Sequence, residues 1–358
     1  MRVLTVVGNR PQFVKAAPLS RALRALGTEI LVHSGQHYDP ALADLFFDEL
    51  GIPEPDHHLG IGPGTPVEQI ARMLTSLDPI MRSENPDAVV VLGDTTTTLA
   101  GALTAAKLNI PIAHVEAGLR SFDRSMPEEQ NRVVTDHLSM LRLCPTQSAV
   151  DNLAREGILD GVHLVGDVMF DACLMFGPAA ARRDTSSTFG VQNGDYVLVT
   201  VHRAAATDTL PALRSLVDVL KAVDGPAVFP LHPRTRAKLS EAGLLERVMA
   251  IPGLSLVAPV GYLDFMSLLV NARAVLTDSG GVQKEAYFHG VPCITVRDTT
   301  EWVETVEGGF NALTGMNAER VREALRSPSI PAVRPNYYGE GDAAERIAQA
   351  LLELTGPS

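Results

Sequence analysis

The chain has 358 residues, of which 46% are hydrophobic and 20% are charged. This is the composition of a soluble globular protein, and the length is sufficient for two domains. The formal net charge is −12, with no block of basic residues, which argues against a nucleic acid as the main partner. A phosphorylated ligand is still compatible with this charge, because local arginines, lysines and helix N-termini can bind it.

The cysteines and the apolar runs exclude several other classes. Cys144, Cys173 and Cys293 stand alone and form no CxxC pair, so the sequence predicts neither a disulfide framework nor a zinc site. The N-terminal apolar run is too short for a signal peptide, and no apolar stretch is long enough to span a bilayer. We therefore expect a cytoplasmic protein without a membrane partner.

Short runs of valine, leucine and isoleucine alternate with helical stretches, which predicts parallel sheets covered on both faces. The runs are 3–7, 30–34, 88–92, 112–115 and 141–144, then 196–201, 227–230, 254–257, 274–277 and 293–296. The rhythm restarts near residue 195, after a polar segment at 178–187 that suits a linker. We expect an α/β protein with two doubly wound, Rossmann-like domains, residues 1–170 and 190–335, that face a cleft.

The first strand ends in Gly8-Asn9-Arg10-Pro11, and Lys15 follows in the expected helix. Ligands of open α/β sheets bind beyond the carboxyl ends of the strands. Two cations at that edge predict a phosphate or carboxylate partner, and the alternative is a pair of surface charges. No GxGxxG follows the first strand, which argues against a dinucleotide oxidoreductase.

Three carboxylates are expected at the same edge. Asp94 and Glu116 follow strands, and Glu128 lies where a helix begins. Carboxylates held close together cannot all ionise easily, so one keeps its proton and an acid–base pair results. A single aspartate at a strand end is usually a helix cap, but three neighbouring acids favour a catalytic role.

Histidine and arginine follow strands in the second half of the chain. His202 and Arg203 come directly after the run 196–201, and His232 follows the next strand. His202 could donate a hydrogen bond to a phosphate or carry a proton. The alternative for His202 is a structural histidine in the core.

The stretch Thr277-Asp278-Ser279-Gly280-Gly281 turns from a strand into a helix. Glycines allow a ligand to approach bare backbone there, and the positive end of a helix suits a phosphate. Glu285, about one helical turn further on, could accept bonds from a ribose diol. The alternative is a helix that is merely capped by Asp278 or Ser279.

Taken in order and at these spacings, the motifs resemble the non-hydrolysing UDP-N-acetylglucosamine 2-epimerases along essentially the whole chain. The matching pieces are Arg10-Pro11 with Lys15, 93–98, 114–120, 127–129, Asn131-Arg132, His202-Arg203, 277–281, Gln283, Glu285 and 297–301. The resemblance implies the glycosyltransferase-B architecture, with a C-terminal helical segment, 336–358, that crosses back to the N-terminal domain. It also implies a homodimer that needs neither a metal nor another cofactor.

The resemblance also implies a role for each matching residue. The family's catalytic positions correspond to Asp94, Glu116, Glu128 and His202. Its diphosphate-binding turn corresponds to Ser279, Gly280 and Gly281, and its ribose contact to Glu285. We expect further substrate contacts from Arg10, Lys15, Arg203, His232 and Arg297.

The implied reaction inverts C2 of UDP-N-acetylglucosamine to give UDP-N-acetylmannosamine. UDP is eliminated to leave a 2-acetamidoglucal, and it adds again after protonation on the opposite face. The first turn, Pro11-Gln12-Phe13, is more similar to the branch that acts on diacetamido-uronate sugars. The alternative substrate is therefore UDP-2,3-diacetamido-2,3-dideoxyglucuronate.

Alternatives from other classes stay open. A UDP-sugar transferase of the same architecture needs at most one base, so the three carboxylates with His202 disfavour it. A hydrolase that releases free N-acetylmannosamine is a third option, because the sequence does not show how water is excluded. For the activator site known in some bacterial members, Gln36 and His37 match, but Gly64-Thr65 and Ala204 do not supply its arginines.

Overall fold

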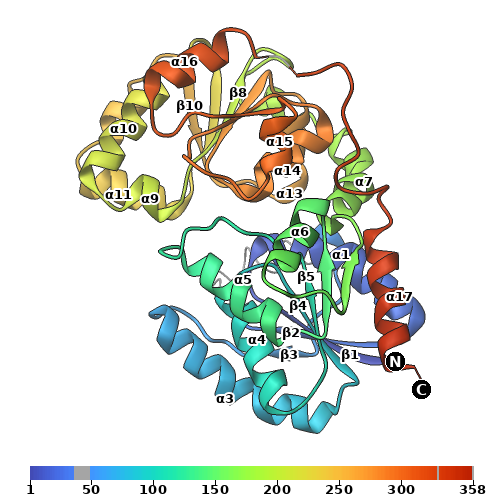
Figure 1. Ribbon diagram of the computed structural model, residues 1–358. Helices are drawn as coiled ribbons and strands as arrows, with labels where there is room; N and C mark the ends of the chain where they lie inside the picture. Colours follow the sequence, from blue (N-terminus) through green and yellow to red (C-terminus); the bar gives the residue numbers. More distant parts are fainter. Residues whose placement is uncertain (36–48, 329, 357–358) are drawn as a thin grey trace. The chain divides into compact units, whose positions relative to one another are not determined.

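The computed structural model describes residues 1–35, 49–328 and 330–356. The chain divides into two compact units (Figure 1), which we call unit 1 (Met1–Met175 and Asn336–Ser358) and unit 2 (Phe176–Pro335). Each unit contains one parallel sheet with helices packed around it. The predicted α/β class, with two parallel-sheet domains, is confirmed.

Unit 1 is built on a seven-stranded sheet of order β3-β2-β1-β4-β5-β6-β7. Its strands are β1 (Arg2–Val7), β2 (Thr28–His33), β3 (His57–His58), β4 (Ala88–Leu92), β5 (Ile112–Val115), β6 (Leu141–Cys144) and β7 (Val162–Leu164). All five residues of β4 are buried, because helices cover both faces of a doubly wound sheet. The strand order reverses between β1 and β4, which is where ligands of such sheets bind.

The helices of unit 1 include a pair that joins the two ends of the chain. They are α1 (Arg10–Leu26), α3 (Pro66–Glu84), α4 (Thr96–Lys107), α5 (Pro127–Leu138), α6 (Gln147–Arg155), the start of α7 (Val168–Ala180) and α17 (Ala343–Thr355). The C-terminal helix α17 packs against α1 (Figure 1). It buries Ile347 and Leu351 on one face, so the last segment of the chain is part of the core of unit 1.

Unit 2 repeats this plan with a six-stranded sheet of order β10-β9-β8-β11-β12-β13. Its strands are β8 (Val197–Thr200), β9 (Ala227–Pro230), β10 (Leu254–Val257), β11 (Ala274–Thr277), β12 (Cys293–Thr295) and β13 (Asn311–Leu313). Its helices are α8 (Thr185–Thr188), α9 (Ala204–Thr207), α10 (Leu210–Lys221), α11 (Pro233–Glu241), α12 (Leu245–Met249), α13 (Tyr262–Val270), α14 (Gly280–His289), α15 (Val303–Glu307) and α16 (Ala318–Arg326).

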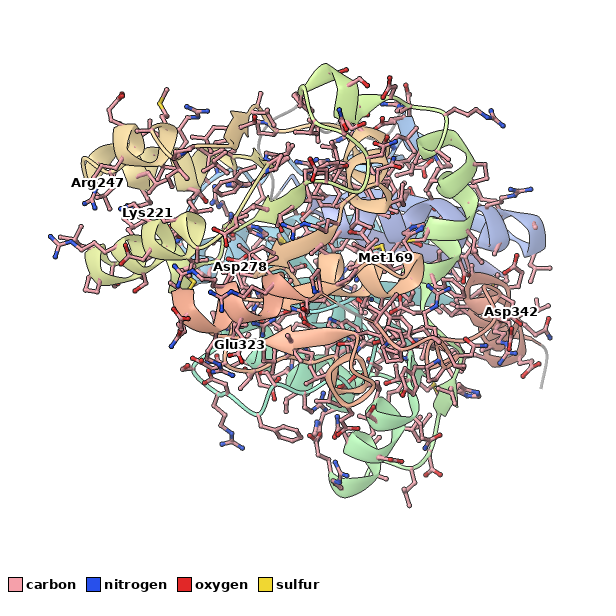
Figure 2. All side chains as sticks on the ribbon, turned by 90° about the horizontal axis from the view of Figure 1, so that it is seen from above. Met169, Lys221, Arg247, Asp278, Glu323 and Asp342 are labelled. Carbon is pink, nitrogen blue, oxygen red and sulfur yellow. The ribbon has the colours of Figure 1, made fainter. Side chains whose placement is uncertain are left out.

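Helices α10 and α12 of unit 2 each have one buried and one exposed face. Leu216 and Leu220 of α10 are buried in the core, while Lys221 of α10 and Arg247 of α12 point outward (Figure 2). Apolar residues three and four positions apart place one face of such a helix against the sheet. Across both units, we find no described helix with the length and apolarity needed to cross a bilayer.

The structure corrects the sequence-based secondary structure in two respects. Three short strands, β3, β7 and β13, were not predicted, because runs of two or three partly exposed residues lack an apolar pattern. The expected linker at 178–187 is largely helical, since α7 runs to Ala180 and α8 covers Thr185–Thr188. Unit 1 gives way to unit 2 earlier, inside α7, between Met175 and Phe176.

Candidate functional site

The carboxyl ends of β1 and β4 are joined by the side chain of Gln12, which is buried near the start of α1. Its Oε1 accepts the N–H of Gly8 at 2.8 Å, and its Nε2 donates to the carbonyl of Leu92 at 2.8 Å. A Cβ on Gly8 would lie only 2.3 Å from Oγ1 of Thr97. Glycine is therefore required where the turn after β1 packs against α4.

The predicted site residues Lys15 and Glu116 form an ion pair at this edge of unit 1. The exposed fractions of the two side chains are 9% and 6%. Glu116 has φ 68°, the left-handed region that residues other than glycine rarely adopt. A Cβ on Gly93 would lie 3.3 Å from Oε2 of Glu116, so the ion pair lies beside the turn that leads to Asp94.

Asp94 is held from α5. Arg132 donates to Oδ2 of Asp94 from Nη2 at 2.6 Å and from Nε at 3.1 Å. The same guanidinium donates from Nη1 to Glu129 at 2.9 Å, and Asn131 donates to the backbone carbonyl of Asp94 at 2.8 Å. Asp94 is thereby fixed by two neighbouring side chains of one helix.

Glu128 lies in the first turn of α5 and is half-buried. It precedes Asn131 by three positions and Arg132 by four, so it shares the helix face that holds Asp94. Its carboxylate makes no hydrogen bond or ion pair with the residues that the structure describes. Helix geometry thus brings Glu128 to the side of α5 that contacts Asp94. The carboxylate of Glu128 itself is not held by another described side chain.

Arg10, the first residue of α1, lies at the same edge, after β1. Burial lowers the pKa of its guanidinium, and the charge of Glu49 opposes this shift. A cation held in a partly dehydrated position suits an anionic ligand. The ligand contacts of Arg10 and Lys15 stay predictions. Lys15 already has a carboxylate partner within the protein, Glu116.

In unit 2, Asp278 at the end of β11 organises the turn after β8. The side chain is buried, and its Oδ2 accepts the N–H of His202 at 2.9 Å and the N–H of Arg203 at 2.7 Å. Nδ1 of His202 lies 3.5 Å from Oδ1 of Asp278, and the His202 ring centroid lies 5.6 Å from that of His232. Asp278, labelled in Figure 2, thus holds two predicted site residues.

The first turn of α14 has no side-chain cap. The alternative that Asp278 or Ser279 caps this helix is wrong, because Asp278 bonds to the turn after β8 and Ser279 makes no capping bond. A Cβ on Gly281 would have only Ser279 Oγ near it, at 4.0 Å. The free N–H groups of this turn are therefore open to an anion.

Aromatic and charged side chains surround that turn. Trp302 Nε1 would lie 3.3 Å from a Cβ on Gly280, and Nζ of Lys284 lies 4.1 Å from the centroid of the Trp302 ring. Glu285 is buried in α14. Arg297 is paired with Glu301 through two bonds of 2.8 and 3.0 Å.

Each unit also has residues near its predicted site residues to which sequence reasoning gave no functional role. They are Gln12, Glu129 and Arg132 in unit 1, and Asp278, Lys284 and Trp302 in unit 2. Most stand within the quoted motifs, which was a usable signal, but their partners are distant in sequence. Gln36 and His37, matched to an activator site, lie outside the described residues.

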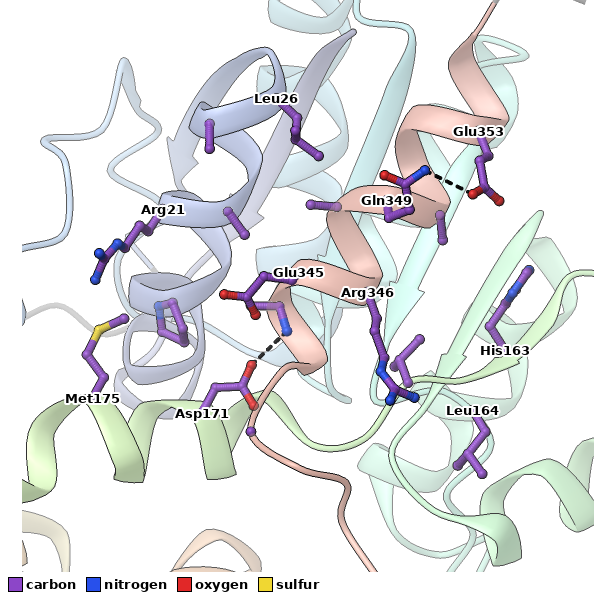
Figure 3. Close-up of a pocket in the computed structure, with 18 of the residues that line it drawn as sticks. Arg21, Leu26, His163, Leu164, Asp171, Met175, Glu345, Arg346, Gln349 and Glu353 are labelled. Carbon is purple, nitrogen blue, oxygen red and sulfur yellow. Dashed lines mark hydrogen bonds between the residues drawn. The ribbon is translucent and has the colours of Figure 1, made fainter.

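Unit 1 also has a groove on its surface. The groove, of about 1300 Å³, is lined by α1, β7, α7 and α17 (Figure 3). Asp171 of α7 accepts the N–H of Ala344 in α17 at 2.7 Å within it. None of the predicted site residues lines this groove. Within the described ranges, no cluster of three or more histidine, cysteine, aspartate or glutamate residues suits a metal ion.

Comparisons with known proteins agree across the whole chain. The family described as UDP-N-acetylglucosamine 2-epimerase matches residues 21–352. A Methanococcus maripaludis protein named UDP-N-acetylglucosamine 2-epimerase homolog is 46% identical, over 99% of this chain and 100% of its own. A Pseudomonas aeruginosa UDP-2,3-diacetamido-2,3-dideoxy-D-glucuronate 2-epimerase is 45% identical, over 99% and 100%. The crystal structure of Methanocaldococcus jannaschii UDP-GlcNAc 2-epimerase with UDP-GlcNAc and UDP matches with a TM-score of 0.94 at 42% identity, covering 99% and 100%.

Proposed function

Since this chain belongs to the UDP-N-acetylglucosamine 2-epimerase family, we propose that it interconverts UDP-N-acetylglucosamine and UDP-N-acetylmannosamine. It acts as an isomerase that inverts C2 without net hydrolysis. The observation that carries this proposal is the set of carboxylates in unit 1, where Asp94 is paired with Arg132, Glu116 is paired with Lys15, and Glu128 is untethered. A protein that only binds a nucleotide sugar needs no such set.

We assign the diphosphate of the substrate to the first turn of α14. Ser279 precedes this turn, and Gly280 and Gly281 present free N–H groups and the positive end of a helix there. His202 and Arg203, held by Asp278, add donors to this part of the substrate. Negative charge grows on the diphosphate as it leaves, so these donors stabilise the transition state more than the ground state. Glu285, Arg297 and His232 are the further substrate contacts that we propose.

We assign the chemistry at C2 to the carboxylates of unit 1. As the C1–O bond to UDP breaks, positive charge on the ring acidifies the C2–H. A carboxylate takes that proton, and the C–H electrons form the C1=C2 bond of a 2-acetamidoglucal. An acid on the opposite face then protonates C2, and UDP adds back at C1. Asp94, Glu116 and Glu128 are the groups that move these protons.

The second candidate substrate is UDP-2,3-diacetamido-2,3-dideoxyglucuronate. It is favoured by the P. aeruginosa relative, whose 45% identity nearly equals the 46% of the first relative. It is also favoured by the first turn, Pro11-Gln12-Phe13, which resembles that of the branch acting on diacetamido-uronate sugars. The mechanism is the same for both sugars, because their C1 and C2 chemistry is shared.

We further propose that the enzyme works in the cytoplasm as a homodimer. The support for both statements is membership of the family. Size measurement by light scattering on the pure protein tests the dimer directly.

The experiment that tests the function follows deuterium at C2. The pure protein is incubated with UDP-N-acetylglucosamine in heavy water, and proton NMR records C2–H and any UDP-N-acetylmannosamine. We expect deuterium at C2 together with the second sugar nucleotide. D94N and E128Q should abolish exchange, whereas D151N, an exposed aspartate on α6, serves as the matched control and should leave it unchanged.

The remaining outcomes separate the alternatives. Exchange with the diacetamido-uronate nucleotide alone keeps the mechanism and changes the substrate. Free N-acetylmannosamine without its nucleotide indicates a hydrolase. No exchange with either nucleotide, with UDP released only after an acceptor sugar is added, would overturn the proposal in favour of a transferase.

A further inference from the structure

His114 of β5 is fully buried, two positions before Glu116, and both nitrogens of its ring contact oxygen atoms. Nδ1 lies 2.7 Å from Oδ1 of Asp136, and Nε2 lies 2.7 Å from the carbonyl oxygen of Gly93. A carbonyl oxygen can only accept a hydrogen bond, so Nε2 carries a hydrogen.

The other nitrogen faces a carboxylate. Oδ2 of Asp136 already accepts bonds from Arg120 Nη1 at 2.7 Å and from the N–H of Gly118 at 3.1 Å. Burial would raise the pKa of Asp136, but the charges and hydrogen bonds of His114 and Arg120 hold it below its ordinary value. An ionised carboxylate only accepts. Hydrogens on both nitrogens of His114 would therefore complete both hydrogen bonds of the ring.

Further charged side chains surround the His114 ring. Arg120 donates from Nε and Nη2 to the two oxygens of Glu156, at 2.7 and 2.8 Å. Arg120 thus links two carboxylates, Asp136 and Glu156. Arg142, the neighbour of His114 on β6, donates to the backbone carbonyl of Asp136 at 2.8 Å. A buried charge is tolerated when it is paired and hydrogen-bonded in this way.

At one end of this hydrogen-bond network, His114 fixes the turn that carries Asp94. Gly93 donates its N–H to the carbonyl of Val115 at 2.9 Å, and its own carbonyl accepts from His114. Both polar groups of Gly93 are therefore held by β5, although Gly93 belongs to the turn after β4. The peptide group that joins Gly93 to Asp94 has little freedom to rotate.

The other end fixes the turn that carries Glu116. Asp136 accepts the N–H of Gly118, which has φ 80° and lies two positions after Glu116. A Cβ on Gly118 would lie 2.3 Å from the carbonyl oxygen of Ala149, so the turn is packed as well as hydrogen-bonded. His114 and Asp136 together connect the two turns.

We propose that His114 is a positioning residue, a buried imidazolium whose two N–H groups hold the turns carrying Asp94 and Glu116 in one arrangement. The inference rests on the proposed function, in which these two carboxylates act on the substrate. His114 acts through Gly93 and Asp136. A neutral ring would satisfy only one of its two acceptors and would turn a lone pair toward the other.

The charge state is tested on the wild-type protein by NMR of ¹⁵N-labelled histidine rings. At neutral pH we expect one ring with hydrogens on both nitrogens, and its signals should vanish in H114Q. A His114 ring with a single N–H would overturn the proposal. D136N is the second variant, because it removes the counter-charge with little change of shape and should convert the ring to the neutral form.

Positioning is tested by backbone amide exchange, which needs no substrate. The amides of Gly93 and Gly118 should exchange at least about 10-fold faster in H114Q or D136N, while amides in unit 2 keep their wild-type rates. H137Q is the matched control, since His137 is exposed on α5. Unchanged exchange at Gly93 and Gly118 would overturn the proposal.

Kinetics complete the test and keep it separate from the proposed function. For H114Q we expect kcat to fall about 100-fold, as for misplaced catalytic groups, with KM within about 3-fold of the wild type. Equal kcat in H114Q and H137Q, or an effect confined to KM, would contradict positioning. A wild-type protein that exchanges no C2 hydrogen would defeat the proposed function, yet the ring NMR and amide exchange would still decide the role of His114.

Discussion

Lys15 on α1 and Glu116 after β5 form an almost completely buried ion pair between residues 101 positions apart in the sequence. Glu116 takes part with its backbone at φ 68°. Such a conformation costs about 1–3 kcal/mol for a residue other than glycine, and it persists where the surrounding structure enforces it. The strained glutamate and its buried partner are the strongest structural support for the proposed chemistry at this edge of unit 1.

The variant K15M should lose both stability and activity. Methionine keeps an apolar stem but leaves the carboxylate of Glu116 buried without this cation. Removing one partner of a buried pair costs about 3–5 kcal/mol, so we expect a loss of about 3 kcal/mol in the free energy of unfolding and no C2 exchange. Urea unfolding of the pure variant measures the first effect, and the deuterium assay measures the second.

Two further variants show whether the effect of K15M comes from the unpaired charge of Glu116. K107M changes an exposed lysine at the end of α4 and should alter the unfolding free energy by no more than about 0.5 kcal/mol. The double variant K15M/E116Q also removes the buried negative charge, so it should recover at least part of the stability without recovering activity. A K15M protein as stable as the wild type would show that Glu116 does not depend on Lys15.

R132K should slow the reaction while preserving charge. The guanidinium of Arg132 binds Asp94 and Glu129 at the same time, and a lysine ammonium cannot reproduce that planar fork. We expect kcat to fall about 100-fold through misplacement of Asp94, with KM nearly unchanged. Initial rates by NMR measure both constants, and R155K on the exposed end of α6 is the control. A change in KM alone would place Arg132 in substrate binding instead.

The sequence was sufficient to predict the strands that are buried on both faces. All residues of β4 are valine, leucine or alanine, so its position could be predicted directly. The two residues of β3, His57 and His58, instead form a strand because β2 lies beside them. Pairing with a neighbour is a long-range effect that a local pattern does not contain. The expected linker failed for a similar reason, because the polar run Thr185–Thr188 forms the short helix α8, which packs against α13.

For the site, the sequence predicted which acids follow strands but not what holds them. Arg132 reaches Asp94 across 38 positions, and Asp278 reaches His202 across 76. Asp278 was considered as a local helix cap, which is the usual role of an aspartate at a strand end. The fold brings a competing pair of N–H groups to it from the neighbouring strand β8, and they take its oxygen instead.

D278A should weaken the binding of UDP by about 10-fold or more, which corresponds to about 1.4 kcal/mol. The change removes the acceptor for two N–H groups and frees the turn that carries His202 and Arg203. Calorimetric titration with UDP alone measures the effect without catalysis. D278N keeps an acceptor oxygen in place and should bind UDP nearly as well as the wild type. Equal affinity of D278A and D278N for UDP would show that this turn does not contribute to nucleotide binding.

Asp171 makes the stability of unit 1 depend on pH. Burial, with smaller contributions from Glu345 and Asp167, raises the pKa of Asp171 to about 6, against the opposing effect of the N–H groups of Ala344 and Ala343. Its Oδ1 has no partner among the described residues. An unfolded aspartate titrates near 3.9, so between these values the folded protein binds the proton more strongly. Stability is therefore highest below the unfolded pKa and falls as the pH rises through about 6.

D171N should remove this pH dependence and stabilise the protein above pH 6. The amide is neutral at every pH, and its oxygen can still accept the N–H of Ala344 in the first turn of α17 (Figure 3). We expect about 2–3 kcal/mol of additional stability at pH 7.5 and no difference near pH 3.5. Urea midpoints at the two pH values measure this, with the exposed D151N as the control. A D171N protein less stable than the wild type at pH 7.5 would mean that the charge of Asp171 stabilises the N-terminus of α17 more than burial opposes it.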